Sequence, residues 1–458
     1  MNNTSIPSPP SPQPSPASVR GSNREKHLFT TAIIGGGYAG MAAAATLASH
    51  NISVTVFESA KQLGGRARGV WSHNTQLDNG QHILLGCYHQ TLRLIELVGG
   101  NIERDFQRLP LQLTLHKRFE LKAPPLPAPF HLLFGFILAR GLSVGARLRA
   151  ARFMLAMRRC KFKLARDISA LELLRSYQQD DNLIRLLWEP ICISALNTPV
   201  QKASAQVLLN VLRDSLNGSR ADSDMLLPRI DFSALFPERA EKYTRNHGGQ
   251  VLLSHSIEAI NRVDHAFELI TSQGAYTFDH VICAATPSNA ARLLRQMPLL
   301  DKLADQIDAL AFQPIYTVYL QYPPSVRLPQ PMLGLNRCIS QWLFDRGQIA
   351  AQHGLIAVVI SAEGIHQDLS QDDLALKVID ELTLHLGISE TPVWHQVIAE
   401  KRATFSCEAN LSRPAHLTLL PNLFLAGDYT EGDYPATLEG AVASGITCAQ
   451  EIVKKYSR

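Results

Sequence analysis

The chain has 458 residues, a length that suits two or three domains. A hydrophobic fraction of 46% and a charged fraction of 18% are typical of a globular protein, and they exclude wholesale disorder, a collagen-like repeat and a coiled coil. The net charge of +4 is too small to indicate a partner. Seven cysteines without a C-x-x-C spacing predict free thiols in a reducing compartment and no metal site.

The beginning of the chain differs in composition from the rest. Residues 5–18 hold six Pro and five Ser, a mixture that favours extended conformations and cannot form a core. Residues 1–27 are therefore expected to be a disordered tail, with a linker-borne docking motif as the alternative. No secretory signal is recognised there, and the apolar residues 127–139 fall short of the ~18 residues that span a bilayer. A cytoplasmic protein is expected.

Folded structure is predicted to begin with a βαβ unit. Residues 28–34 (LFTTAII) form an apolar run that stops at three glycines, and the Ala-rich residues 41–49 follow. This order predicts a strand, a tight turn and a helix. Residues 52–57 (ISVTVF) predict a second buried strand, which the crossover makes parallel to the first.

Two later segments, residues 279–285 (DHVICAA) and 422–426 (NLFLA), are predicted to join the same sheet. The predicted fold class is α/β: a doubly wound, Rossmann-like dinucleotide-binding domain with an inserted, mixed α+β substrate domain. The nucleotide domain is assigned to residues 28–85, 238–289 and 413–455, and the substrate domain to residues 86–237 and 290–412.

A dinucleotide fingerprint follows the first predicted strand. Gly35 allows the tight turn, Gly37 lets the backbone approach a pyrophosphate, and Gly40 lets the helix pack closely on the strand. Glu58 ends the second strand, where an acid accepts hydrogen bonds from ribose hydroxyls and repels a 2′-phosphate. The alternative is a plain turn with a surface glutamate. A second glycine turn, Gly64-Gly65-Arg66, can place a cation beside the pyrophosphate.

These motifs resemble the superfamily of flavin amine oxidases and carotenoid desaturases. The C-terminal segments 425–428 (LAGD) and 435–445 (PATLEGAVASG) resemble its second FAD motif. The resemblance implies bound FAD, with Asp428 near the pyrophosphate and ribitol and a helix N-terminus facing the flavin. It places the following residues at the cofactor: Gly35, Gly37, Tyr38, Ala39, Gly40, Glu58, Gly64, Gly65, Arg66, Ile257, Gly427, Asp428, Thr437, Leu438 and Glu439.

Residues 77–82 (LDNGQH), 341–346 (QWLFDR) and 400–405 (EKRATF) narrow the resemblance. Together they look like the squalene-associated FAD-dependent desaturase family, now understood as hydroxysqualene dehydroxylases. That resemblance implies reductive loss of an allylic hydroxyl, with hydride from reduced flavin, to give squalene for hopanoid synthesis. The alternatives are a carotenoid or apocarotenoid desaturase that uses oxidised FAD, and a prenyl-binding carrier without catalysis.

The candidate catalytic residues are His82, Asp78, Asp345 and Tyr434. His82 has an ordinary pKa of ~6.5 that suits proton delivery, although a structural histidine in a turn is the alternative. Asp78 is expected to orient His82 or bind flavin, or else to form a turn. Asp345, with Arg346, is expected at the rim or at the hydroxyl end of the substrate.

The candidate substrate residues are Trp342, Phe344 and Tyr316. Trp342 and Phe344 alternate with Leu343 in a predicted strand and so share a face, which walls an isoprenoid slot or packs in the core. Tyr316 lies where amine oxidases often carry a Lys near the flavin, if the segments are aligned correctly.

Residues 121–166 hold ten Lys and Arg and no Asp or Glu. Beside an apolar run, this charge suits a peripheral contact with the anionic inner face of the cytoplasmic membrane; a solvated basic helix pair is the alternative. Arg147 and Arg149 fall on roughly opposite sides of a helix, so the cations do not form one face. The expected partners are a C30 isoprenoid, this membrane surface and an unidentified electron donor, and no nucleic acid.

Overall fold

The computed structural model describes residues 30–456, so the predicted tail at residues 1–27 lies outside the described residues. Its first layer is a five-stranded parallel sheet in which β1 pairs with β2 and with β14, as the predicted βαβ unit requires. The strands predicted at residues 279–285 and 422–426 are present as β14 and β20. In spatial order the strands are β10 (Gln250–Leu253), β2 (Val54–Glu58), β1 (Thr31–Ile34), β14 (His280–Cys283) and β20 (Leu423–Leu425).

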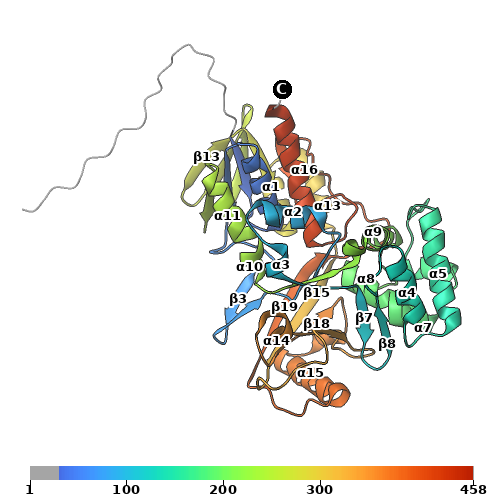
Figure 1. Ribbon diagram of the computed structural model, residues 1–458. Coiled ribbons are helices and arrows are strands. Elements are labelled where there is room, and N and C mark those ends of the chain that lie inside the picture. Colours follow the sequence, from blue (N-terminus) through green and yellow to red (C-terminus); the bar gives the residue numbers. More distant parts are fainter. Residues whose placement is uncertain (1–29, 457–458) are drawn as a thin grey trace, which may run out of the picture.

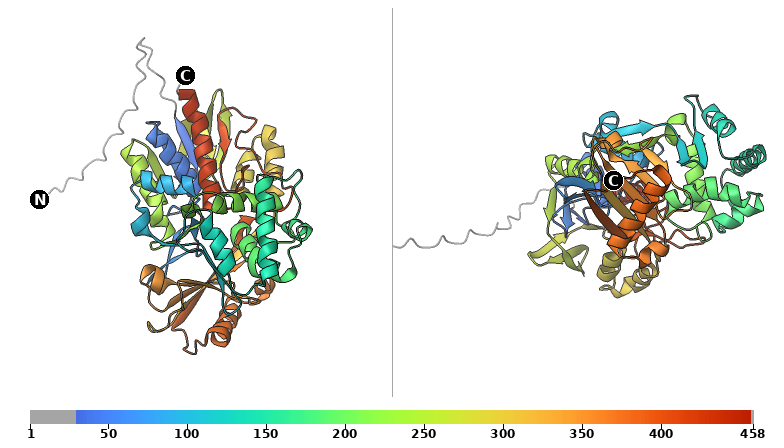
Figure 2. Two further views of the ribbon diagram at one scale, coloured as in Figure 1. Left: turned by 45° about the vertical axis from the view of Figure 1, so that its right-hand side comes forward. Right: turned by 90° about the horizontal axis from the view of Figure 1, so that it is seen from below.

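Helices cover one face of this sheet, and three antiparallel strands cover the other (Figures 1 and 2). Phe57 of β2 contacts the rings of Tyr276 and Phe278 on the strand side. The covering helices are α1 (Tyr38–Ser49), α2 (His89–Leu97), α11 (Pro237–Asn246) and α16 (Leu438–Tyr456), and the strands are β11 (Ile257–Val263), β12 (Ala266–Thr271) and β13 (Gly274–Phe278). The helices α12 (Pro287–Leu294) and α13 (Asp301–Asp308) follow β14.

A second sheet of seven strands lies below the first in Figure 1. Its strands are antiparallel apart from the pair β16 and β7. Both inserted stretches contribute to it, because β7 and β8 come from one and the remaining strands from the other. The order is β19 (Trp394–Phe405), β15 (Phe312–Gln321), β18 (Leu355–Ser361), β17 (Trp342–Asp345), β16 (Met332–Gly334), β7 (Gln112–Leu115) and β8 (Phe119–Lys122).

Helices flank the second sheet on its outer face and at one end. The outer face packs against α15, as the core around Val318, Val358 and Leu382 shows. At the end, a cluster of helices projects from the right side of Figure 1. The elements are α14 (Arg346–Ala350) and α15 (Gln371–Leu386), and in the cluster α4 (Phe130–Leu138), α5 (Val144–Arg159), α6 (Ala170–Ser176), α7 (Asp181–Leu183), α8 (Glu189–Leu196) and α9 (Ala205–Leu216).

Short elements connect these layers. They are β3 (Gly69–Ser72), β4 (Thr75–Asp78), β5 (Leu84–Leu85), α3 (Ile102–Asp105), β6 (Phe106–Leu109), β9 (Met225–Pro228) and α10 (Phe232–Leu235). One boundary differs from the predicted division. Helix α2 was assigned to the substrate domain, but Leu94 and Ile95 pack in the same core as α1 and α16. Within residues 30–456, no helix combines the length and the apolarity needed to cross a bilayer.

Candidate active site

A cavity of about 560 Å³ lies between the carboxyl ends of the parallel strands and the inner face of the second sheet. This volume is in the range of small-molecule and cofactor sites, and the carboxyl edge is where open α/β sheets bind ligands. The structure brings the following predicted cofactor residues to its wall: Gly35, Gly37, Tyr38, Ala39, Glu58, Gly64, Gly65, Arg66, Ile257, Gly427, Asp428, Thr437 and Leu438.

The glycine-rich turn is shaped by close backbone approaches. Gly35 has φ +111°, and a Cβ there would lie 2.6 Å from the carbonyl oxygen of Ala284. A Cβ on Gly40 would lie 1.9 Å from the carbonyl oxygen of Gly35, so its part is helix packing rather than contact with the cavity. Gly37, by contrast, has no atom nearer to a Cβ than the Cα of Gly65 at 3.8 Å. Its open side leaves a ligand free to reach the backbone.

The two glycine turns are joined to each other and to Glu58. The N–H of Gly64 donates to the carbonyl of Gly36 at 2.9 Å. Glu58 accepts from the N–H of Gly36 at 2.6 Å through Oε2 and from the N–H of Ala60 at 2.7 Å through Oε1. These bonds fix the carboxylate at the end of β2, which is the position from which an acid binds ribose hydroxyls.

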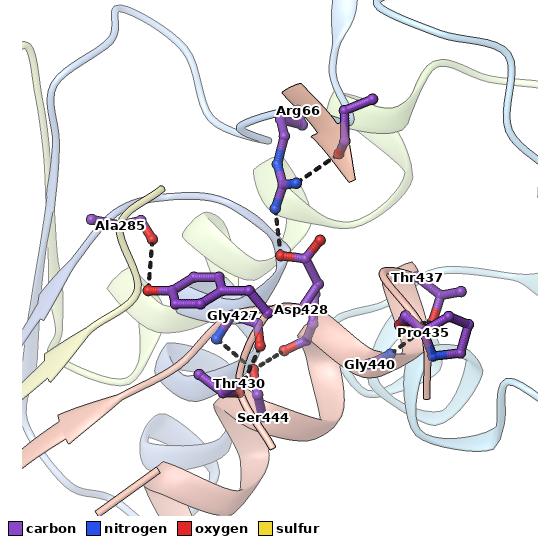
Figure 3. Close-up of polar contacts among 12 residues, drawn as sticks. Arg66, Ala285, Gly427, Asp428, Thr430, Pro435, Thr437, Gly440 and Ser444 are labelled. Atoms are coloured by element: carbon purple, nitrogen blue, oxygen red, sulfur yellow. Dashed lines mark hydrogen bonds and ion pairs between the residues drawn. The ribbon is translucent and has the colours of Figure 1, made fainter. Parts of the chain in front are cut away.

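Arg66 reaches across the cavity wall to the C-terminal motif (Figure 3). Its Nη2 donates to Oδ1 of Asp428 at 2.5 Å, and its Nη1 donates to the carbonyl of Ala403 at 2.7 Å. Burial alone would lower the pKa of Arg66, but the carboxylate of Asp428 holds it above the usual value. A fixed cation therefore lies at the predicted pyrophosphate position.

Helix α16 begins at this wall. The hydroxyl oxygen of Thr437 accepts from the N–H of Gly440 at 3.1 Å and caps the helix (Figure 3). Further along, a Cβ on Gly445 would lie 2.1 Å from the carbonyl oxygen of Ala39, so α16 and α1 touch through backbone. The N-termini of both helices thereby meet at one cavity. Together with Glu58 and Arg66, these features fit FAD, which needs an acid for ribose and positive groups for the pyrophosphate.

The second sheet supplies an apolar wall. Trp342 and Phe344 both line the cavity, whereas Leu343 between them packs in the core against α15. Tyr316 was expected at this wall, and that expectation is wrong. Its side chain lies in the core on the α15 side, edge-on to the ring of His366 at 4.9 Å. Ile315, one residue earlier in β15, lines the cavity instead, because successive side chains of a strand face opposite sides.

His82 also lines the cavity. Its Nδ1 lies 2.6 Å from the carbonyl oxygen of Gly80, which makes Nδ1 the protonated nitrogen. Burial lowers the pKa of His82 below its usual value; the bond to Gly80 opposes this shift and the charge of Arg66 adds to it. The ring is therefore neutral at neutral pH, and Nε2 is the nitrogen that can accept a hydrogen bond from a ligand.

Asp78 does not contact the cavity but supports the ring of His82 from behind. Its Oδ1 accepts from the N–H of Phe232 at 2.9 Å, and the ring of Phe232 packs on that of His82 with centroids 4.9 Å apart. Burial raises the pKa of Asp78 to about 7, while Arg346 and the N–H of Phe232 limit the rise. Arg346 is buried and donates to Oε1 of Gln81 at 3.1 Å. The side chains of Asp78 and Arg346 therefore hold the segment that carries His82 in place.

Three predicted site residues lie away from the cavity wall. Asp345 caps α14 by accepting from the N–H of Gln348 at 3.0 Å, and it makes no ion pair with Arg346 within residues 30–456. Glu439 is buried and caps α2 by accepting from the N–H of Thr91 at 2.9 Å, so it faces away from the cavity. Tyr434 lies in the loop before α16 and is not part of the cavity wall. The fold uses the carboxylates of Asp345 and Glu439 as helix caps, and Tyr434 lies outside the cavity wall.

Asn197 is one of the wall residues that the sequence analysis missed. Asn197 ends α8 with φ 45°, and its side chain donates to the hydroxyl of Thr404 at 2.9 Å and accepts from the N–H of Ala362 at 2.7 Å. It thereby fixes the end of α8 against the second sheet, where both Asn197 and Thr404 line the cavity. The signal was an asparagine at a helix C-terminus, a residue that tolerates the left-handed conformation.

Comparison with known proteins agrees with this geometry. The family model "Flavin containing amine oxidoreductase" matches residues 38–453. A hydroxysqualene dehydroxylase of Sinorhizobium fredii is 29% identical and covers 91% of this chain and 96% of its own length, and one of Rhodopseudomonas palustris is 28% identical with 93% and 98% covered. A zeta-carotene desaturase of Solanum lycopersicum is 23% identical, with 90% of this chain and 79% of its own length covered.

Solved structures share the fold. An oxidoreductase of Methanosarcina mazei has a TM-score of 0.72 at 16% identity, covering 92% of this chain and all of its own. A putative protoporphyrinogen oxidase of Exiguobacterium has a TM-score of 0.69 at 18% identity, covering 93% and 99%. The predicted Rossmann-like fold, the FAD cofactor and the resemblance to hydroxysqualene dehydroxylases are confirmed. The chain belongs to the family of flavin-containing amine oxidoreductases.

Proposed function

We propose that this protein converts hydroxysqualene to squalene by reductive loss of the allylic hydroxyl, in squalene and hopanoid synthesis. The observation that carries the proposal is the cavity itself, which joins a cradle fitted to FAD with an aromatic wall and the imidazole of His82. The relatives named hydroxysqualene dehydroxylase support the same substrate.

The reaction breaks one C–O bond, forms one C–H bond and releases water, so it needs two electrons and two protons in total. FAD, when bound and reduced, supplies the two electrons together with one proton as a hydride. A separate electron donor must restore the reduced cofactor. The protein itself must hold the substrate, protonate the departing oxygen and keep water away from the allylic carbon, which becomes electron-poor as the C–O bond breaks.

The residues of the wall divide these tasks. Trp342 and Phe344 present rings to the cavity, where they exclude water and place π-electrons beside a developing positive charge. His82 accepts a hydrogen bond from the substrate hydroxyl through Nε2 when neutral. Its lowered pKa makes the protonated ring a stronger acid, so a proton taken up at Nε2 passes readily to the leaving oxygen.

A single-turnover experiment tests the proposal. Purified enzyme, reduced anaerobically with dithionite, is mixed with hydroxysqualene, and the products are separated by gas chromatography and mass spectrometry. Squalene should form with reduced enzyme and not with oxidised enzyme. Desaturation of a polyene by the oxidised enzyme would favour the desaturase alternative, to which the zeta-carotene desaturases at 23% identity point. A protein that purifies without flavin and converts neither compound would be a carrier.

The proposed chemistry does not require attachment to the cytoplasmic membrane surface, but such attachment would suit it, because the substrate dissolves in lipid rather than in water. Residues 121–166 remain the predicted contact. They form β8, α4 and α5 with their connections, at the side of the molecule where the helix cluster projects (Figure 1).

A further inference from the structure

Helix α4 turns its apolar side to solvent. Its exposed residues follow the spacing i, i+3, i+4, i+7 and i+8, which in a globular protein normally marks the buried side of a helix. The opposite side is the one that packs: His131 is buried, and Gly135 lies over the backbone of Ala123. The exposed residues and their exposed fractions are Phe130 51%, Leu133 50%, Phe134 41%, Ile137 51% and Leu138 64%.

Helix α5 continues this surface and adds positive charge. Val144, Leu148 and Leu155 are 69%, 53% and 50% exposed, while Phe153 and Met157 face the core. Within residues 30–456, six cations of the helix and the segment after it make no ion pair. They are Arg152, Arg158, Arg159, Lys161, Lys163 and Arg166.

The two helices are held together as a unit. Arg147 donates to the carbonyl of Ile137 at 2.5 Å and to that of Leu142 at 3.1 Å, so it joins the end of α4 to the start of α5. Arg149 pairs with Asp180 on the other side. Arg147 and Arg149, which the helical periodicity places on roughly opposite sides of the helix, therefore both have structural partners. The unpaired cations lie on the exposed side of α5 and in the segment after it.

We infer that the α4–α5 surface, defined as the exposed residues of α4 and α5 with the six unpaired cations, docks on an anionic lipid bilayer. Apolar side chains beside cations match the acyl boundary beside anionic headgroups. A second copy of this chain is a poorer occupant, because a two-fold contact would bring the same unpaired cations of both copies together. The inference concerns binding to lipid and does not depend on the proposed substrate.

Packed side chains connect the docking surface to the cavity. Phe153, on the inner side of α5, contacts the ring of Trp188 with centroids 5.1 Å apart. Trp188 immediately precedes α8, whose last turn supplies Ser194 and Ala195 to the cavity wall. Helix α8 therefore links the inner side of α5 to the cavity wall. If the proposed function holds, this places a lipid-dissolved substrate near its point of use.

Vesicle sedimentation tests the inference. The full-length holoenzyme is mixed with vesicles of phosphatidylcholine alone or with 30% phosphatidylglycerol, and the bound fraction is measured at low and high salt. Binding should be at least about tenfold stronger with the anionic lipid and should weaken with salt. L133D/I137D and R158E/R159E should each reduce binding to anionic vesicles about tenfold or more.

Matched controls separate this surface from general effects. L376D/L384D changes two exposed leucines of α15, and K302E/K377E reverses two exposed cations elsewhere; both should bind as the wild type does. Flavin absorbance and circular dichroism confirm folding of each variant.

Three outcomes would overturn the inference. One is equal binding to neutral and anionic vesicles. A second is loss of binding in R158E/R159E but not in L133D/I137D, which would indicate a site for polyanions in general. The third is a dimer that L133D/I137D converts to a monomer while vesicle binding is unchanged, which would assign the surface to a second copy. None of these measurements uses hydroxysqualene, so their failure is distinguishable from failure of the proposed function.

Discussion

Arg66 and Asp428 form an ion pair at 2.5 Å although 362 positions separate them in the chain. The pair connects the turn after β2 to the loop after β20, and so links the two motifs that flank the cavity (Figure 3). Because Arg66 also donates to the carbonyl of Ala403, three distant segments meet at one guanidinium. The cofactor cradle is completed by this contact.

The first prediction concerns this pair. Asp428→Asn should weaken FAD binding by roughly 1–3 kcal/mol, because Arg66 loses its charged partner and its fixed orientation. Arg66→Met should have a similar effect. Isothermal titration of the apoprotein with FAD measures both, and the double variant should lose less than the sum of the single losses, as expected for residues in contact. Additive losses would show that the two residues act separately.

A second prediction concerns Glu58. Glu58→Ala should cost ~1–3 kcal/mol of FAD affinity, the range for hydrogen bonds to a charged group. Glu58→Gln, which keeps an oxygen acceptor, should cost less. The same titration measures both variants, and Glu268→Ala, in β12 and away from the cavity wall, is a suitable control. FAD should leave the wild-type chain on denaturation, since its binding is expected to be noncovalent. Yellow colour retained by the denatured chain would contradict this.

The third prediction concerns His82. His82→Ala should slow the single-turnover formation of squalene by ~10²–10⁴-fold, the usual contribution of general-acid catalysis, and leave FAD affinity unchanged. Because burial lowers the pKa of His82, its protonated, acidic form accumulates only at a pH below the usual range for histidine. The wild-type rate should therefore rise with falling pH, and the variant should lose this dependence. The exposed His265→Ala is the matched control; an unchanged rate in His82→Ala would remove the acid assignment.

The fourth prediction concerns Asp78 and stability. Its pKa is about 7 in the folded protein against 3.8 for the free side chain, so the folded state binds the proton more tightly. The free energy of unfolding should therefore fall as pH rises from about 4 to about 7, by on the order of 4 kcal/mol. Urea unfolding at a series of pH values measures this slope. Asp78→Asn keeps an acceptor for the N–H of Phe232 and should flatten it, and an equal slope in both proteins would contradict the assignment.

Local sequence was sufficient for the nucleotide cradle. The glycines of the turn and Glu58 lie within one βαβ unit, where strand, turn and helix follow one another and the backbone geometry decides which residue fits. Local sequence also predicted part of the aromatic wall. Trp342 and Phe344 share a face because they stand two residues apart in a strand, although the sequence left open which face it was.

Tertiary structure decided the rest, because the remaining choices depend on contacts between distant segments. Strand β15 is buried on both faces. Its sequence therefore has no alternation of polar and apolar residues from which to predict that Ile315, rather than Tyr316, faces the cavity. Glu439 could meet the cofactor or cap α2, and only the docking of α2 beside α16 decided it. The apolar spacing of α4 is that of a core helix in sequence; its apolar face is exposed because the opposite side, which carries the buried His131 and Gly135, is the one that packs on the chain around Ala123.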